Sequence, residues 1–187
     1  MATTQDRVPA GGWKGDGGIP AVSIRSARVT DLGVIGRLEI RSFSNPWHPD
    51  TFRSLLEQPR AKVWVAEDPE AGVVGYAVLW WVLDQGELAN LAVRPDQRGR
   101  GNGSALLDRA ISHAESEGVE SLFLEVRVSN EAAHRLYASR GFTQISVRKN
   151  YYESPREDAR ILVKHLPPAL HLEGDKGGDG TGKESRE

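Results

Sequence analysis

The chain contains no cysteine among its 187 residues, which excludes disulfide bonds, thiolate metal sites and a cysteine nucleophile. No apolar run reaches membrane-spanning length, and the N-terminal residues lack the apolar core of a secretory signal. The net charge is -2, so no overall basic field would attract nucleic acid. The five histidines show no spacing typical of metal ligands. We therefore expect a cytoplasmic protein with no metal, no membrane contact and no direct nucleic-acid binding.

The middle of the chain has the composition of one globular domain. The whole sequence is 39% apolar and 27% charged, which is typical of a soluble protein with a core of ordinary size. Both ends differ from this average, because they are rich in glycine and in polar or charged residues and bury little apolar surface. We expect a single domain over residues 21–166, flanked by disordered tails at 1–20 and 167–187.

A glycine-rich loop lies between an apolar strand and a helix. The strand spans Leu88 to Val93, and the loop carries Gly99, Gly101 and Gly103. Such a loop exposes backbone N–H groups at the positive end of a helix, where an anion binds. It lacks the lysine of a nucleotide P-loop and the third glycine and later acidic residue of a dinucleotide fold. The pattern indicates another phosphate-bearing ligand, although a flexible turn would have the same sequence.

A second segment narrows the ligand class. It runs from Leu122 to Phe142 and contains Leu-Glu-Val-Arg-Val-Ser-Asn, Leu-Tyr and Gly-Phe in that order. With the early loop Phe43-Ser-Asn-Pro-Trp47, the Arg98-x-x-Gly-x-Gly loop and the late Asn150-Tyr-Tyr, it resembles the GNAT N-acetyltransferases. The likeness is greatest to their RimI-type branch, which acetylates ribosomal-protein alanine, and it covers roughly residues 22–163. The resemblance implies acetyl-CoA as the cosubstrate.

The hydrophobic periodicity predicts an α/β (α+β) fold with a mixed sheet. We expect a helix capped by Thr30 and ending near Phe43, a loop bounded by Pro46 and Pro49, and a short helix around Phe52 that ends near Pro59. The other expected helices are 103–117 and about 130–141, and the expected strands are 22–25, 62–67, 73–83, 87–93, 122–128, 142–149 and 159–164. This order resembles the acyl-CoA N-acyltransferase (GNAT) fold: a mostly antiparallel sheet, splayed between strands 4 and 5, with helices on both faces.

Glu125 is the candidate general base. Period-two alternation puts Leu122 and Leu124 on one face of their strand and Glu125 with Arg127 on the other. A carboxylate in an apolar strand is costly unless it is paired or functional. It could lie on a solvated face or pair with Arg127. The resemblance implies that Glu125 accepts the proton of the attacking amine, directly or through a water.

Tyr137 is the candidate general acid. An amphipathic tyrosine in the core is the alternative, since such residues are common. The Leu-Tyr and Gly-Phe context resembles the position where the family protonates the leaving thiolate. A thiolate, with a pKa of about 8.5, benefits from a positioned proton donor.

The remaining site residues are also assigned by the resemblance. Backbone groups freed by a strand bulge would bind the thioester and pantetheine, a row of N–H groups and arginines would hold the diphosphate, and Asn130 would cap its helix and touch the cofactor. Asn130 could also be only a cap, and Asn102 stands where the family has an aliphatic residue. The predicted cofactor-binding set is Leu91, Ala92, Val93, Arg98, Gly99, Arg100, Gly101, Asn102, Gly103, Ser104 and Asn130.

Four aromatic residues are predicted to lie in loops, where recognition residues often occur. They could equally pack beneath those loops. The resemblance implies that they flank the acceptor peptide. They are Phe43, Trp47, Tyr151 and Tyr152.

The expected chemistry is direct transfer of the acetyl group to an amine, without a covalent enzyme intermediate. An α-amine has a pKa of about 7.7–8.0 and a lysine of about 10.4, so one carboxylate base suits an N-terminal amine better. The resemblance implies a protein N-terminus, typically that of an alanine-starting ribosomal protein. Alternatives are a GNAT enzyme acting on lysine or a small amine, a non-catalytic acetyl-CoA-binding module, or a ribosome-associated protein without chemistry.

Overall fold

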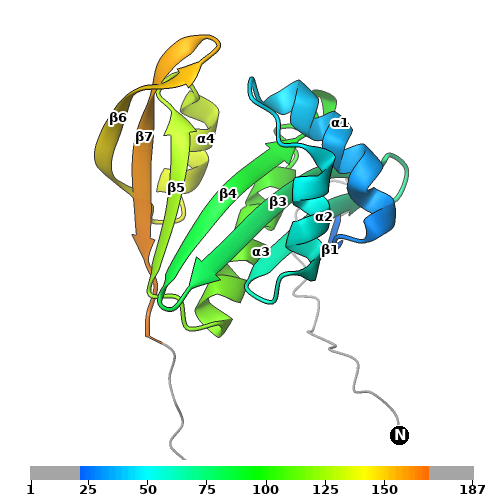
Figure 1. The fold of residues 1–187 in the computed structure, drawn as a ribbon, viewed down its shortest axis with the longest axis horizontal. Coiled ribbons are helices and arrows are strands. Elements are labelled where there is room, and N and C mark those ends of the chain that lie inside the picture. Colours follow the sequence, from blue (N-terminus) through cyan, green and yellow to red (C-terminus); the bar gives the residue numbers. More distant parts are fainter. Residues whose placement is uncertain (1–21, 169–187) are drawn as a thin grey trace, which may run out of the picture.

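The computed structural model describes residues 22–168, so the two expected tails lie outside it, apart from 167 and 168. One seven-stranded sheet forms the centre, in the order β1-β2-β3-β4-β5-β7-β6 (Figure 1). Its strands are β1 (Ser23–Ser26), β2 (Ala61–Asp68), β3 (Gly72–Val82), β4 (Gln85–Val93), β5 (Ser121–Arg127), β6 (Thr143–Glu153) and β7 (Arg156–His165).

The sheet opens between β4 and β5, as expected. These two strands are the parallel pair in a sheet whose other neighbours are antiparallel. Their pairing stops after Gln85, Gly86 and Glu87, and the strands then diverge toward the carboxyl end of β4 (Figure 1). In the β3–β4 register Val78 faces Asn90 and Leu79 faces Leu88, so Ala89 is an extra residue. This β-bulge bends β4 where it leaves β5.

Helices cover both faces of the sheet, each through an apolar stripe. The helices α1 (Leu32–Ser42) and α2 (Pro49–Glu57) bury Ile35, Leu38 and Phe52 against one face. The helix α3 (Asn102–Ser116) and the short α4 (Glu131–Ala138) pack on the other face, which Figure 1 shows behind the sheet. No helix within residues 22–168 combines the length and apolarity needed to cross a membrane.

Two local predictions were wrong. A 3-10 turn (Val29–Asp31) precedes α1, and Asp31 rather than Thr30 provides the side-chain acceptor, binding the Arg28 N–H at 2.7 Å. The loop bounded by Pro46 and Pro49 is confirmed, since α2 begins at Pro49, whose fixed φ suits the first helical position. The strand β6 continues to Glu153, so Tyr151 and Tyr152 lie in an irregular strand rather than a loop.

Candidate active site

The edge of β4 that faces the gap carries free backbone groups. The Arg94 N–H donates to the Val74 carbonyl at 2.8 Å, which directs it toward β3. Backbone groups alternate sides along an antiparallel strand, so the N–H groups of Leu91 and Val93 point to the open edge. Ala92 buries its side chain in the α1–α2 core. Within residues 22–168, the gap between β4 and β5 is therefore lined by backbone donors without a strand partner.

The glycine-rich loop joins β4 to α3. It includes a 3-10 turn (Pro95–Gln97), and Gly99 and Gly101 have φ values of 73° and 85°, which glycine adopts without strain. The Ala105 N–H donates to the Gly101 carbonyl at 2.9 Å, as the first bond of α3. The N–H groups of the three preceding residues therefore have no acceptor within the helix. With Arg100 beside them, they fit an anion such as a diphosphate.

Two side chains of the predicted cofactor set shape this loop from within. Asn102 is buried, and its Nδ2 donates to the Gln97 carbonyl at 2.9 Å. The Arg98 Nε donates to the Val93 carbonyl at 3.0 Å, which fastens the loop to the end of β4. A Cβ on Gly103 would lie 3.5 Å from Leu136 of α4, so the start of α3 lies close to α4.

Asn130 caps α4 as expected. Its side chain accepts a hydrogen bond from the Ala133 N–H at 3.1 Å, which satisfies one free donor of the helix start.

Glu125 lies on the predicted face of β5. Leu122 and Leu124 are buried in the α3–α4 core, whereas Glu125 is half-buried on the opposite face. Its carboxylate pairs with the Arg148 Nη1 at 2.7 Å, and not with Arg127. The alternative in which Glu125 pairs with Arg127 is therefore wrong, because its partner is Arg148 of β6.

Tyr137 is buried on α4, with its ring 5.7 Å from that of Phe142. Burial is the main cause that raises the pKa of Tyr137, with a smaller contribution from Tyr152. The hydroxyl therefore stays protonated at neutral pH, which is the state that a proton donor needs.

The four predicted acceptor aromatics divide into two pairs. Phe43 and Trp47 pack against the α1–α2 core, and the Trp47 ring stacks on Trp80 with centroids 5.7 Å apart. Tyr151 and Tyr152 lie near Glu125 instead: Arg148, which pairs with Glu125, lies 4.8 Å from the centroid of the Tyr151 ring, and the two tyrosine rings are 5.1 Å apart. A hydrogen bond with Glu125 raises the pKa of Tyr151, and burial, followed by the charge of Glu125, raises the pKa of Tyr152 to about 12. The structure thus brings Tyr151 and Tyr152 to the candidate base.

Arg127 joins the two sides of this region. Its Nη2 donates to the Ser44 Oγ at 2.7 Å, in the loop that carries Phe43 and Trp47. Its Nη1 pairs with Glu157 at 3.0 Å, and its guanidinium lies 4.0 Å from the centroid of the Tyr152 ring. Arg127 therefore links the early loop to β5, β6 and β7.

Sequence reasoning missed two residues here, Arg148 and Glu39. Glu39 is 1% exposed in α1 and accepts hydrogen bonds from the Trp47 N–H and from the side chains of Tyr76 and Asn90. Its only sequence signal is a carboxylate on the apolar stripe of α1, four residues after Ile35.

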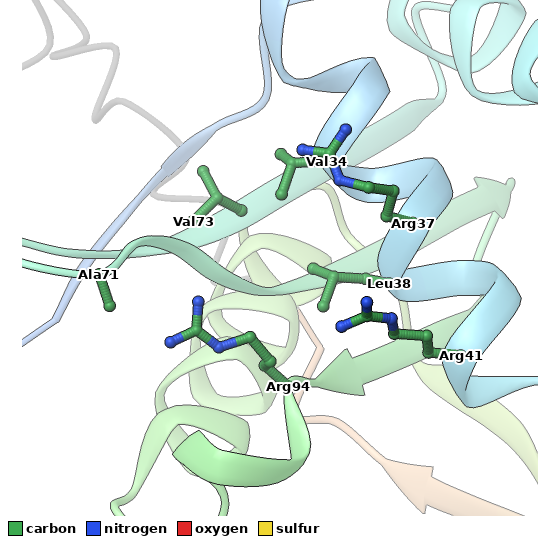
Figure 2. Close-up of a pocket in the computed structure, with 7 residues that line it drawn as sticks. All are labelled: Val34, Arg37, Leu38, Arg41, Ala71, Val73 and Arg94. Atoms are coloured by element: carbon green, nitrogen blue, oxygen red, sulfur yellow. The ribbon is translucent and has the colours of Figure 1, made fainter.

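A separate surface cavity of about 320 Å³ lies beside α1 (Figure 2). It shares no residue with the predicted catalytic, cofactor or acceptor sets, and its arginines come from α1 and the residue after β4. Its lining residues are Val34, Arg37, Leu38, Arg41, Ala71, Val73 and Arg94. Within residues 22–168 no group of three or more histidine or acidic side chains is arranged to hold a metal.

Comparison with known proteins places this geometry in a family. Residues 34–142 match the family model described as "Acetyltransferase (GNAT) family". The ribosomal protein bS18-alanine N-acetyltransferase of Escherichia coli K12 is 38% identical over 143 residues, covering 75% of this chain and 95% of that protein. Its counterpart from Haemophilus ducreyi is 38% identical over 140 residues, covering 73% and 94%. The crystal structure of the ribosomal-protein-S18-alanine N-acetyltransferase from Escherichia coli aligns with a TM-score of 0.70 at 37% identity, covering 82% and 97%.

Proposed function

This chain belongs to the GNAT acetyltransferase family, and we propose that it acetylates the N-terminal α-amine of a protein. The acceptor we propose is a ribosomal protein that begins with alanine, the class named for its relatives. One observation carries the proposal: β4 and β5 stop pairing after Glu87 and Phe123, and Glu125 follows on the freed part of β5. We also propose a cytoplasmic location, where such an acceptor is made.

Acetyl-CoA would supply the activated acetyl group. The fit rests on the free N–H groups at the start of α3 and on the arginines beside them, which suit the negative charge of a diphosphate. The N–H groups of Leu91 and Val93 would hold the amides and the thioester carbonyl along the gap. The Asn130 side chain, at the start of α4, would also contact the cofactor.

Glu125 and Tyr137 would move the two protons of the reaction. Glu125 receives the proton that the amine loses as its nitrogen forms the new C–N bond. Tyr137 gives a proton to the sulfur as the C–S bond breaks, and its raised pKa means that the phenol still carries this proton at neutral pH. Base and acid suffice for this exchange, so the proposed chemistry uses no metal.

An N-terminal amine is the acceptor that this site favours. Its pKa of about 7.7–8.0 leaves a substantial neutral fraction near neutral pH, whereas a lysine at about 10.4 is almost wholly charged. Tyr151 and Tyr152, beside Glu125, would flank the first residues of the peptide. The Trp47 loop, which Ser44 joins to Arg127, would form the other side.

Thiol release from acetyl-CoA, measured over a panel of peptides, tests the proposal. The panel contains peptides that begin with alanine, serine or methionine and an N-terminally blocked peptide bearing lysine, with mass spectrometry to locate the acetyl group. We expect the alanine peptide to be acetylated at its α-amine. Activity on the blocked peptide alone would reject the proposed acceptor, and CoA binding without turnover of any peptide would reject the enzymatic role.

A further inference from the structure

Glu39 lies at the centre of a buried hydrogen-bond cluster. The Trp47 N–H donates to Oε1 at 2.9 Å, and the Asn90 Nδ2 lies 3.2 Å from both carboxyl oxygens. The Tyr76 hydroxyl donates a hydrogen bond to Oε2. These partners come from the loop after α1, from β3 and from β4, so one side chain fastens three segments to α1.

Burial of the Glu39 carboxyl group is unfavourable for the free energy of folding. Glu39 is 1% exposed, and within residues 22–168 no Lys, Arg or His pairs with its carboxyl group. Burial raises the pKa of Glu39, and the hydrogen bonds only partly oppose that effect. Burying a carboxyl group without a charged partner is costly, and even buried ion pairs can often be replaced by apolar residues of similar volume without loss of stability. A reason other than packing is therefore needed for a carboxyl group at this position.

The partners of Glu39 border both halves of the proposed reaction. Trp47 belongs to the loop that would form one side of the acceptor channel, and its ring stacks on Trp80. Asn90 follows the Ala89 bulge and directly precedes Leu91, whose N–H faces the gap between β4 and β5. Glu39 thus connects the side where the acceptor would enter to the strand edge where the thioester would lie.

Resting on the proposed function, we propose that Glu39 is a positioning residue that sets the acceptor loop at a fixed distance from the thioester edge of β4. Its carboxyl group acts through the Trp47 N–H and the Asn90 amide and touches neither substrate. A misplacement of about 1 Å can lower the rate of a transfer reaction by about 100-fold, so the link would matter for the acceptor step.

Two substitutions separate positioning from packing. Glu39→Leu keeps the volume and loses every acceptor, whereas Glu39→Gln keeps one oxygen for the Trp47 and Asn90 donors. We expect Glu39→Leu to lower kcat/KM for an alanine-initiated peptide by about 10-fold or more and Glu39→Gln to stay within about 3-fold of wild type. The Kd of acetyl-CoA should be unchanged in both. Glu57→Gln, an exposed glutamate at the end of α2, is the matched control.

The outcomes are distinguishable. A folded Glu39→Leu variant with wild-type kcat/KM overturns the inference, as does one that loses acetyl-CoA affinity by the same factor. If Glu39→Gln and Glu39→Leu lower kcat/KM by the same factor, the charge of Glu39 is what matters, and this result also overturns the inference. If Glu39→Leu does not fold, Asn90→Ala must lower the peptide kcat/KM while Kd for acetyl-CoA holds, or the inference is wrong. Absence of turnover by the wild-type chain rejects the proposed function itself, and this inference with it.

Discussion

The Arg148 guanidinium lies 2.7 Å from the Glu125 carboxylate, and the same guanidinium sits 4.8 Å from the centroid of the Tyr151 ring. This places a cation between the candidate base and one of the tyrosines that would flank the acceptor amine. Arg148 is 52% exposed and Glu125 is 22% exposed, so the ion pair lies at the surface of the site, where such pairs exchange readily. An incoming amine can replace the guanidinium without opening the core.

Glu125→Gln is the direct test of the base. The amide keeps the shape of the side chain but cannot accept the proton of the amine, so we expect kcat to fall by about 100-fold or more. The Kd of acetyl-CoA, measured by calorimetry, should be unchanged. Glu120→Gln, an exposed residue just before β5, is the control and should keep full activity. Full activity of Glu125→Gln would show that another group takes the proton.

Tyr137→Phe tests the acid. Loss of the hydroxyl should lower kcat by about 10-fold or more and leave the KM of the peptide unchanged. Because burial raises the pKa of Tyr137, the phenol stays protonated and its donor function persists as the pH rises. The kcat profile of the wild-type chain should therefore show no descending limb between about pH 7 and about pH 9. A descending limb in that range that disappears in Tyr137→Phe would contradict the assignment.

Gly101→Ala tests the diphosphate loop. Gly101 has a φ of 85°, where an alanine is strained by about 1–2 kcal/mol, so the loop should relax away from its present shape. We expect the Kd of acetyl-CoA to rise by about 10-fold or more. Gly118→Ala is a matched control, since Gly118 has a φ of 77° at the far end of α3 and should lose similar stability with no loss of affinity. Equal Kd values of acetyl-CoA for Gly101→Ala and Gly118→Ala would contradict the role of this loop in binding the diphosphate.

Asp31→Asn tests a stabilising cluster away from the site. Arg25 donates to Asp31 at 2.7 and 3.1 Å, and this interaction holds the pKa of Asp31 below its usual value. The lowered pKa means that the stabilisation is present above the unfolded value, about 3.9, and is lost as the pH falls through the folded value. Urea unfolding should show a loss of about 1–3 kcal/mol at pH 7 that shrinks in acid.

The control for that cluster is Asp84→Asn, in the exposed turn between β3 and β4, which should have little effect on stability. A difference between Asp31→Asn and wild type that stays constant down to about pH 3 would disprove the role of the Asp31 charge.

The sequence was sufficient for those parts of the fold and site that depend on local patterns. Alternation along β5 placed Glu125 opposite the buried Leu122 and Leu124, because period two leaves only two faces. The glycine spacing predicted the loop before α3, whose positive φ values suit glycine. The splay of the sheet came from family resemblance, since the Ala89 bulge leaves no local pattern.

The rest depended on contacts between distant segments. In the sequence, Glu39 is only a polar residue on an apolar helical stripe. The structure shows that Tyr76 and Asn90 donate hydrogen bonds to it from two different strands. The end of β6 was predicted as a loop because Asn150-Tyr151-Tyr152 resembles the late loop of the family. Asn150 does have a positive φ of 52°, but β6 pairs with β7 again at Tyr152 and Glu157. Local signals alone cannot show that a strand resumes after an irregularity.

The central claim is that the Arg98–Ser104 loop holds the diphosphate of a coenzyme whose sulfur lies beside Glu125 and Tyr137. A crystal structure with a bisubstrate compound, in which coenzyme A is joined through an acetyl linker to the α-amine of an alanine-initiated peptide, tests it most directly. We expect the diphosphate on the N–H groups at the start of α3, the sulfur within hydrogen-bond reach of the Tyr137 hydroxyl and the peptide nitrogen on the Glu125 side. A diphosphate bound elsewhere, or a sulfur remote from both side chains, would contradict the account.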